Sequence, residues 1–457
     1  MTAVRVWTGR EASALRAALR LSIRDFAELL GVGVRTVTKW QARGEDVCLR
    51  PTMQALLDTA LTRSGDEVRA RFELILGAEH DPASSTDHSP ALAVPPSLLA
   101  DQWDHRKADA LAEFLTDERE LTPGTALTLS QEWRVVDPPQ LVETRAGRRI
   151  GTRLAEVVVE RTDALRRMDD FLGGGDMHDL VRRELRVTLA MVRGASYTEK
   201  TGRLLLGAVG ELCQLAGWVA SDAGLYDLAA RYYLGGVSAA HAADDKPLAA
   251  NLLSSLAYQV ANVGDRPDAV LLACTAYHGA EKTATPTARA LLLERLAWAN
   301  ARFGDTQATI RTLAQVDETF ADSQPDNDPV WVYWLNQDEI DVMAGRCLTE
   351  LKQPKKAIAL LDQAVRRYDD SHAREKALYL SWLAEAHADN GNAEEAAATA
   401  LRALHLSAST TSARSTDRIK VVRRALQSYR GNSAVDEFED QAAAVLDLSD
   451  RGSGLGS

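Results

Sequence analysis

Two sets of positions recur every forty residues in the second half of the chain. The first set is Gly224, Gly264 and Gly304, and the second is Trp218, Tyr258 and Trp298. A fixed period of this length is typical of proteins built from stacked supersecondary units, because each unit buries its apolar face only against its neighbours. Each unit reads as one helix, a turn at the glycine and a second helix.

Small side chains follow these turns at a regular distance. Ala229 and Ala269 lie five positions after their glycines, whereas the third unit has Thr309 at that place. Two less regular units turn near residues 352–354 and at Gly391. Small residues at such spacings allow paired helices to approach closely. The sequence therefore predicts a stack of helix pairs.

The turn and second helix of the first unit, residues 222–226 and 229–233, resemble the tetratricopeptide repeat (TPR) family. The resemblance covers roughly Val209 to His405, with about forty residues per unit. It implies an α-solenoid whose concave face is lined by the first helix of each pair.

The resemblance also implies that Trp218, Tyr258 and Trp298 lie on the concave face. Neighbouring amides and rings suit the backbone and apolar groups of a peptide or a small-molecule effector. The predicted ligand-binding residues are Gln214, Trp218, Asn251, Ser254, Tyr258, Asn262, Glu294, Trp298 and Arg302. The alternative is that the aromatic positions only pack the core. The same two interpretations apply to Trp331, Tyr333 and Trp334.

A second pattern lies near the N-terminus, in the segment from Ser22 to Trp40. Ala27 supplies a small side chain where two helices would cross, and Gly31 permits a tight turn between them. Ser22 and Asp25 form a capping box at the start of the first helix. Apolar residues for the buried faces are Phe26, Leu30, Val32, Val37 and Trp40. Further helices are predicted at residues 11–20, 51–61 and 66–76.

This segment resembles the helix-turn-helix domains of the Cro and lambda repressor class, often called the XRE family, over about the first seventy residues. The resemblance implies that the second helix enters the major groove of double-stranded DNA and that a homodimer reads a two-fold symmetric operator. The DNA-binding residues so implied are Val34, Arg35, Thr38, Lys39, Arg24 and Arg43. Gln is common in the family where this chain has Ile23. Arg24 or Arg20 would then contact the phosphate.

Charge is distributed unevenly along the chain. Residues 1–44 hold eight Lys and Arg against three Asp and Glu, a local charge of +5 in a chain with a net charge of −12. A basic segment favours contact with phosphates. A purely structural helical bundle with a similar helix pair is the alternative.

Residue composition and the order of the predicted segments indicate how the chain divides into domains. Helix formers dominate and strand-like alternation is scarce, so we expect an all-α fold with an N-terminal lambda-repressor-like domain followed by a TPR-like α-solenoid. The predicted divisions are 1–77 for the DNA-binding domain, 78–96 for a flexible linker, 97–175 for a helical intermediate block, 176–448 for the repeats and 449–457 for a disordered tail.

The intermediate block and the C-terminus leave alternatives open. We expect helices at residues 97–115, from Thr122 or Pro123, and at about 147–171. The basic run from Arg145 to Arg153 either contacts DNA phosphate or is a solvated helix start. Helices at residues 417–429 and 435–446 either cap the solenoid or form a dimer interface.

Several functional classes find no support in the sequence. The four cysteines are far apart, without metal-ligand or disulfide spacing. Phosphate-binding loops and nucleophilic constellations are missing, so we expect no cofactor, no metal and no enzyme activity. The N-terminus lacks an apolar signal segment, and the uncharged stretch 247–264 carries polar residues typical of a buried helix. We expect a cytoplasmic protein that does not bind a membrane.

The two modules together resemble actinomycete regulators that pair a repressor-type reader with helical repeats. This resemblance implies a sequence-specific transcriptional regulator whose repeats sense an effector or mediate dimerisation. The alternative is a TPR scaffold that binds a protein partner and uses the N-terminal helices for docking.

Overall fold

The fold is described from a computed structural model. The described residues are 7–19, 21, 23–30, 32–43, 49, 53–54, 57, 60–61, 64, 68, 72, 98–99, 101–117, 119–122, 124–169, 174–368, 373–407 and 413–453. The chain divides into two compact units, Met1–Ser89 and Pro90–Ser457. This division falls within the segment 78–96 expected to be a linker, which lies outside the described residues.

The first unit contains α1 (Gly9–Ala18), α2 (Ile23–Leu29) and α3 (Val34–Arg43). Thr8 and Glu11 form a capping box that defines the start of α1. The three helices share one apolar core, since Leu15, Phe26 and Val37 are all buried in a single cluster. The capping box predicted at Ser22 lies outside the described residues. Within the predicted helices 51–61 and 66–76, the residues that are described, such as Leu57 and Phe72, are helical.

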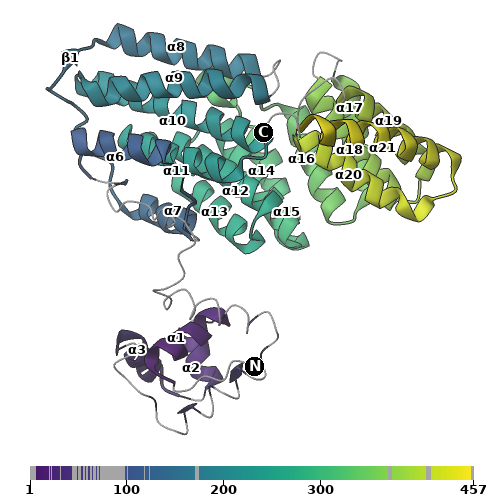
Figure 1. The fold of residues 1–457 in the computed structure, drawn as a ribbon, viewed down its shortest axis with the longest axis horizontal. Helices are drawn as coiled ribbons and strands as arrows, with labels where there is room; N and C mark the ends of the chain where they lie inside the picture. The colour runs from purple at the N-terminus through teal and green to yellow at the C-terminus, as the bar shows by residue number, and fades with distance from the viewer. Residues whose placement is uncertain are drawn as a thin grey trace. The chain divides into compact units, whose positions relative to one another are not determined.

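The second unit is a stack of antiparallel helix pairs, coloured from teal to yellow along the chain in Figure 1. The pairs are α10 (Glu199–Asp222) with α11 (Tyr226–Ala242), α12 (Lys246–Val263) with α13 (Arg266–Ala280), α14 (Pro286–Phe303) with α15 (Thr306–Phe320), α16 (Gln337–Glu350) with α17 (Pro354–Arg367), α18 (Ala373–Asp389) with α19 (Ala393–Ser407), and α20 (Ala413–Leu426) with α21 (Ser433–Ser453). Short 3-10 turns η2 (Pro325–Asn327) and η3 (Val330–Val332) precede α16, and η5 (Gln427–Tyr429) follows α20. The predicted helical repeat architecture is therefore observed.

Local chemistry fixes where these helices start and turn. The side chains of Asp245 and Asp305 accept hydrogen bonds from backbone N–H groups three residues ahead, at 2.9 and 2.8 Å. Gly224 and Gly304 have φ values of +80° and +91°, a conformation that favours glycine. Gly264 differs from them, because its φ is −120° and its backbone is extended. The glycine period therefore marks the turns without requiring one turn geometry.

The intermediate block belongs to the same apolar core as the repeats. It contains α6 (His105–Thr116), α7 (Thr125–Val135) and α8 (Thr152–Asp169), and α9 (Gly174–Gly194) begins at its end and lies mostly in the region predicted as repeats. Trp133 of α7 packs on α13 so closely that a Cβ at Gly279 would lie 2.2 Å from its ring. The buried guanidinium of Arg231 donates to the backbone carbonyl of Phe114. The block thus covers one side of the first repeats.

The structure corrects several predicted boundaries. The first expected helix begins at His105 rather than Ser97, because Asp104 caps it by accepting a hydrogen bond from the Lys107 N–H at 3.0 Å. The next begins at Thr125 after Gly124, not at residue 122 or 123. Helix α21 continues to Ser453, where a disordered tail was expected from residue 449.

A short parallel strand pair interrupts the all-α plan within the described residues. Strand β1 (Arg148–Arg149) pairs with β2 (Ala195–Ser196), so α8 begins at Thr152 rather than near residue 147. The predicted solvated helix start at the basic run is therefore wrong for Arg148 and Arg149. Arg145 and Arg153 are largely exposed and form ion pairs with Glu143 and Glu160 at 2.9 and 3.1 Å.

Helix α10 is the one described helix that is long and apolar enough to span a membrane by length and composition. Neighbouring helices bury 67% of its apolar window. Burial of this extent is typical of the central helix of a helical stack. The uncharged stretch 247–264 forms α12, which is likewise packed among other helices, as predicted.

Candidate functional site

Helix α3 divides its residues between the core and the surface. Val37 and Trp40 are buried, with exposed fractions of 4% and 6%. The opposite face carries exposed Val34, Arg35 and Lys39. Thr38 is also exposed, and its hydroxyl donates to the Val34 carbonyl at 3.1 Å, which leaves its methyl group free for contact. The predicted DNA-binding residues Arg24 and Arg43 have side chains outside the described residues.

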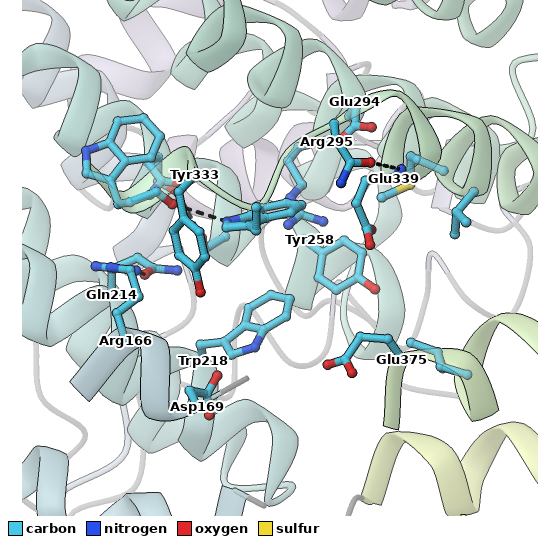
Figure 2. Close-up of a pocket in the computed structure, with 18 of the residues that line it drawn as sticks. Arg166, Asp169, Gln214, Trp218, Tyr258, Glu294, Arg295, Tyr333, Glu339 and Glu375 are labelled. Carbon is cyan, nitrogen blue, oxygen red and sulfur yellow. Dashed lines mark hydrogen bonds between the residues drawn. The ribbon is translucent and has the colours of Figure 1, made fainter. Parts of the chain in front are cut away.

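A pocket of about 350 Å³ lies on the face of the repeats formed by the first helix of each pair. This concave pocket is shown in Figure 2. Residues from α8, α10, α12, α14, α16 and α18 line it, together with η3 and the residue after α17. The lining is Arg166, Asp169, Gln214, Leu215, Trp218, Asn251, Ser255, Tyr258, Glu294, Arg295, Trp331, Tyr333, Trp334, Asn336, Glu339, Val342, Met343, Arg346, Tyr368, Glu375, Leu378 and Tyr379.

Part of the predicted ligand set lines this pocket. The five residues that do so are Gln214, Trp218, Asn251, Tyr258 and Glu294. Trp331, Tyr333 and Trp334, for which packing and binding were both open, line it as well. The prediction that first helices form the inner face therefore agrees with the geometry.

The other four predicted ligand residues lie outside the pocket lining, and each has a structural partner. The hydroxyl of Ser254 is fully buried and donates to the Asn251 carbonyl at 2.8 Å. Asn262 accepts a hydrogen bond from the indole N–H of Trp298 at 3.2 Å. Arg302 forms an ion pair with Glu350 at 2.7 Å. Asn262, Trp298 and Arg302 therefore join adjacent repeats, whereas Ser254 bonds within α12.

The aromatic ladder predicted from the period is present, and it runs from the pocket into the core. The ring centroids of Trp218 and Tyr258 are 6.0 Å apart, and those of Tyr258 and Trp298 are 6.2 Å apart. Trp218 is half-buried, Tyr258 is 7% exposed and Trp298 is fully buried. Trp298 then meets the edge of Trp382 at 5.5 Å. The packing interpretation therefore holds for Trp298, whereas Trp218 and Tyr258 line the pocket and ligand binding there stays a prediction.

Two arginines lie against these rings with different hydrogen-bonding states. Arg346 donates to the Tyr258 hydroxyl at 2.7 Å and lies over the Trp298 ring at 4.5 Å. Arg295 lies over the Tyr258 ring at 4.5 Å and near the Trp218 and Trp334 rings, at 5.7 and 6.0 Å. Figure 2 shows Arg295 beside Tyr258. Each arginine is only 6% exposed, so cation–π contacts replace much of the lost hydration.

Two carboxyl groups with a raised pKa face the same pocket. Burial raises the pKa of Glu294 from 4.5 to about 8, although the positive charge of Arg295 opposes this. Burial also raises the pKa of Glu339, against the opposite effect of hydrogen bonds from Tyr368 and Tyr379. Such shifts result from removing a charged form from water. The pocket therefore combines aromatic surface, buried cations and carboxyl groups of reduced charge.

The sequence reasoning missed Arg295 and Arg346, which are central to the pocket. Arg295 follows Glu294 directly, and Arg346 lies 48 residues after Trp298 in a unit of less regular spacing. It also missed Arg166 and Asp169, because α8 lies outside the repeat pattern. Buried charged residues need partners, but the sequence does not show which charged residues are buried, so it could not identify these four.

The fold and pocket define a class of protein, a helical-repeat solenoid with a lined concave face. The tetratricopeptide repeat family matches residues 341–371, so one TPR repeat is present in the chain. This match falls on α16 and α17, the fourth pair, which is one of the units that appeared less regular by glycine spacing. No curated protein matches the sequence.

Solved structures give distant likenesses. Nearly identical TPR-like repeats of a protein described as a kinesin light chain from Podosopora anserina are 20% identical, with a TM-score of 0.32, covering 44% of this chain and 95% of that one. A signal transduction ATPase with numerous domains and a tetratricopeptide repeat sensor, from Pyrococcus horikoshii, is 12% identical, with a TM-score of 0.36, covering 96% of this chain and 64% of that one. Neither superposes well enough to inform function.

Proposed function

We propose that this protein is a ligand-responsive, DNA-binding transcriptional regulator. Its repeats bind a peptide or small-molecule effector in the concave pocket, and its N-terminal unit binds double-stranded DNA through α3. The observation that carries the proposal is the pocket, in which buried cations and aromatic rings surround about 350 Å³ of space. A cavity of this size and lining is typical of a binding site for a small ligand.

The DNA-binding half is supported by the exposed face of α3. Arg35 and Lys39 extend from this face, and Arg is suited to the O6 and N7 atoms of guanine. The XRE resemblance adds that α3 is the recognition helix and that a cytoplasmic homodimer reads a two-fold symmetric operator. The regulator would have no catalytic activity of its own.

Coupling between the two halves requires that the effector bind one state more tightly than the other. A tenfold change in DNA affinity needs a differential binding free energy of about 1.4 kcal/mol. Such coupling is reciprocal, so operator DNA should change effector affinity by the same factor.

Selection of bound sequences from a random duplex library tests the DNA-binding half. The full chain should enrich a two-fold symmetric motif. The logarithm of its binding constant should fall linearly with the logarithm of salt concentration, with a slope of about −0.9 for each phosphate contacted. Arg35→Ala should abolish enrichment, whereas Arg266→Ala removes the same charge from an exposed site on α13 and should retain it. Enrichment of the motif by both variants would show that Arg35 does not recognise the DNA sequence.

The second candidate is a TPR scaffold that binds a protein partner. The family match at residues 341–371 favours it, because TPR repeats generally bind proteins. A scaffold should show no sequence preference in the same selection. Native mass spectrometry of freshly purified protein then distinguishes a retained small molecule or peptide from a stoichiometric protein partner.

A further inference from the structure

The guanidinium of Arg295 is buried in the concave pocket without a hydrogen-bond acceptor. Among the described residues it makes no hydrogen bond and no ion pair, and it is only 6% exposed. Its neighbour Glu294 influences it electrostatically but lies beyond ion-pair distance. An arginine offers five N–H donors, and those of Arg295 that reach the pocket have no acceptor among the described residues. An acceptor supplied from outside the chain would meet that need.

The aromatic rings hold this guanidinium in place and leave its donors uncommitted. The rings of Trp218, Tyr258 and Trp334 come from three elements and all lie within 6.0 Å of the Arg295 guanidinium carbon. Cation–π contacts satisfy the charge without using N–H groups. The same rings provide flat apolar surface for the body of a ligand. The arrangement suits a compound with an anionic end and an aromatic or apolar remainder.

The other cations of the pocket are already engaged. Arg346 donates to Tyr258, and Arg166 donates to Gln214 at 2.7 Å and forms an ion pair with Glu211 at 3.4 Å. One uncommitted guanidinium matches one planar carboxylate, which it can bind through two parallel hydrogen bonds.

The remaining charges of the lining disfavour a dianion. Besides Glu294, whose pKa is raised to about 8 by burial, the carboxyl groups of Asp169, Glu339 and Glu375 face the pocket. They would repel a phosphate ester more strongly than a monocarboxylate. At about 350 Å³ the space also lies at the small end of ligand pockets, which excludes a long extended peptide.

We propose that the concave pocket binds a small monocarboxylic acid with an aromatic or apolar body, and that Arg295 binds its carboxylate. This inference rests on the proposed receptor role and specifies the ligand class of the same pocket. Burial raises the pKa of Glu294 beside Arg295 to about 8, so its carboxyl group would then offer a hydrogen-bond donor rather than a second negative charge.

Matched pairs of acids and neutral amides test the inference on the full chain. Benzoate, phenylacetate and indole-3-acetate are titrated beside their primary amides and phenyl phosphate at pH 7, by calorimetry. At least one acid should bind about 10- to 100-fold more tightly than its amide, the range expected for hydrogen bonds to a charged group. Phenyl phosphate should bind more weakly than that acid.

Arg295→Met should abolish the difference between acid and amide. Arg302→Met is the matched control, because Arg302 lies on the same helix and outside the pocket lining, and it should preserve the difference. Melting curves show whether each variant is folded, and the comparison in the unaltered protein stands even if Arg295→Met does not fold.

Three outcomes overturn the inference. Equal affinity for an acid and its amide would leave a receptor that does not recognise anions. Tighter binding of phenyl phosphate would identify a phosphate site instead. If none of the compounds binds, the ligand class is wrong, while the regulator proposal still depends on the separate DNA selection.

Discussion

Replacing Tyr258 by Phe should destabilise the repeats through loss of the hydrogen bond from Arg346. The hydroxyl of Tyr258 accepts from Arg346 at 2.7 Å, and Arg346 is 6% exposed with its Nε already lacking an acceptor. The ring stays in its stack, so packing against Trp218 and Trp298 is preserved. A buried charged donor that loses its acceptor costs about 1.5–3 kcal/mol, and we expect the free energy of unfolding to fall by this amount.

The measurement is urea unfolding of the full chain at pH 7, followed by far-UV circular dichroism, with the transition midpoints and slopes compared. Tyr277→Phe is the matched control, because the Tyr277 hydroxyl makes no hydrogen bond among the described residues and its half-buried ring lies tilted against that of His278 at 5.1 Å. This control should change stability by less than about 0.5 kcal/mol.

Equal stability losses in the two variants would refute the reasoning. So would a loss above about 3 kcal/mol for Tyr258→Phe, since that magnitude belongs to removal of the whole ring. The second outcome would mean that the hydroxyl does more than pair with Arg346.

Three further changes have defined outcomes. Arg35→Ala should abolish sequence preference in DNA selection without lowering the melting temperature, because Arg35 is exposed. Glu294→Gln should flatten the stability loss seen by thermal melting between about pH 5 and pH 8. The folded Glu294 has a pKa of about 8 against 4.5, so the stability it contributes is complete below pH 4.5 and is lost as the pH rises through 8. If the melting temperature of the variant fell with pH as steeply as that of the unaltered protein, this reasoning would be contradicted. Gly279→Ala should lower the melting temperature by several degrees, since its methyl group would lie 2.2 Å from Trp133; unchanged melting would show that α7 shifts freely.

The helical stack and much of its inner face were predictable from sequence. Each helix pair must bury its apolar stripe against the next pair, so equivalent buried positions recur along the chain. The forty-residue period of Trp218, Tyr258 and Trp298 is therefore visible in the sequence. Turn glycines and the small residues after them act over a few residues, which is why the repeat helices were found. The helix pair α2 and α3 was found for the same reason, since spacing of its apolar residues fixes which faces are buried.

Boundaries in the intermediate block were less predictable because distant contacts decide them. Strand β1 exists only because Ala195 and Ser196 lie beside it, some 47 residues further along the chain. Nothing in the local composition of Arg148 and Arg149 favours a strand. Helix α7 likewise begins at Thr125 rather than at the predicted residue 122 or 123, and its Trp133 packs on Gly279 of α13, a helix far away in sequence.

The amino-acid sequence by itself determined the repeat period, the turns of the repeats and which face of each repeat points inward, because these depend on neighbours within one or two turns. Only the tertiary structure decided which inward residues pack and which line a pocket. Trp298 and Tyr258 occupy equivalent positions, yet one is sealed by Trp382 and the other borders the cavity. The free donors of Arg295 likewise arise because rings from three elements surround it at distances that no single repeat encodes.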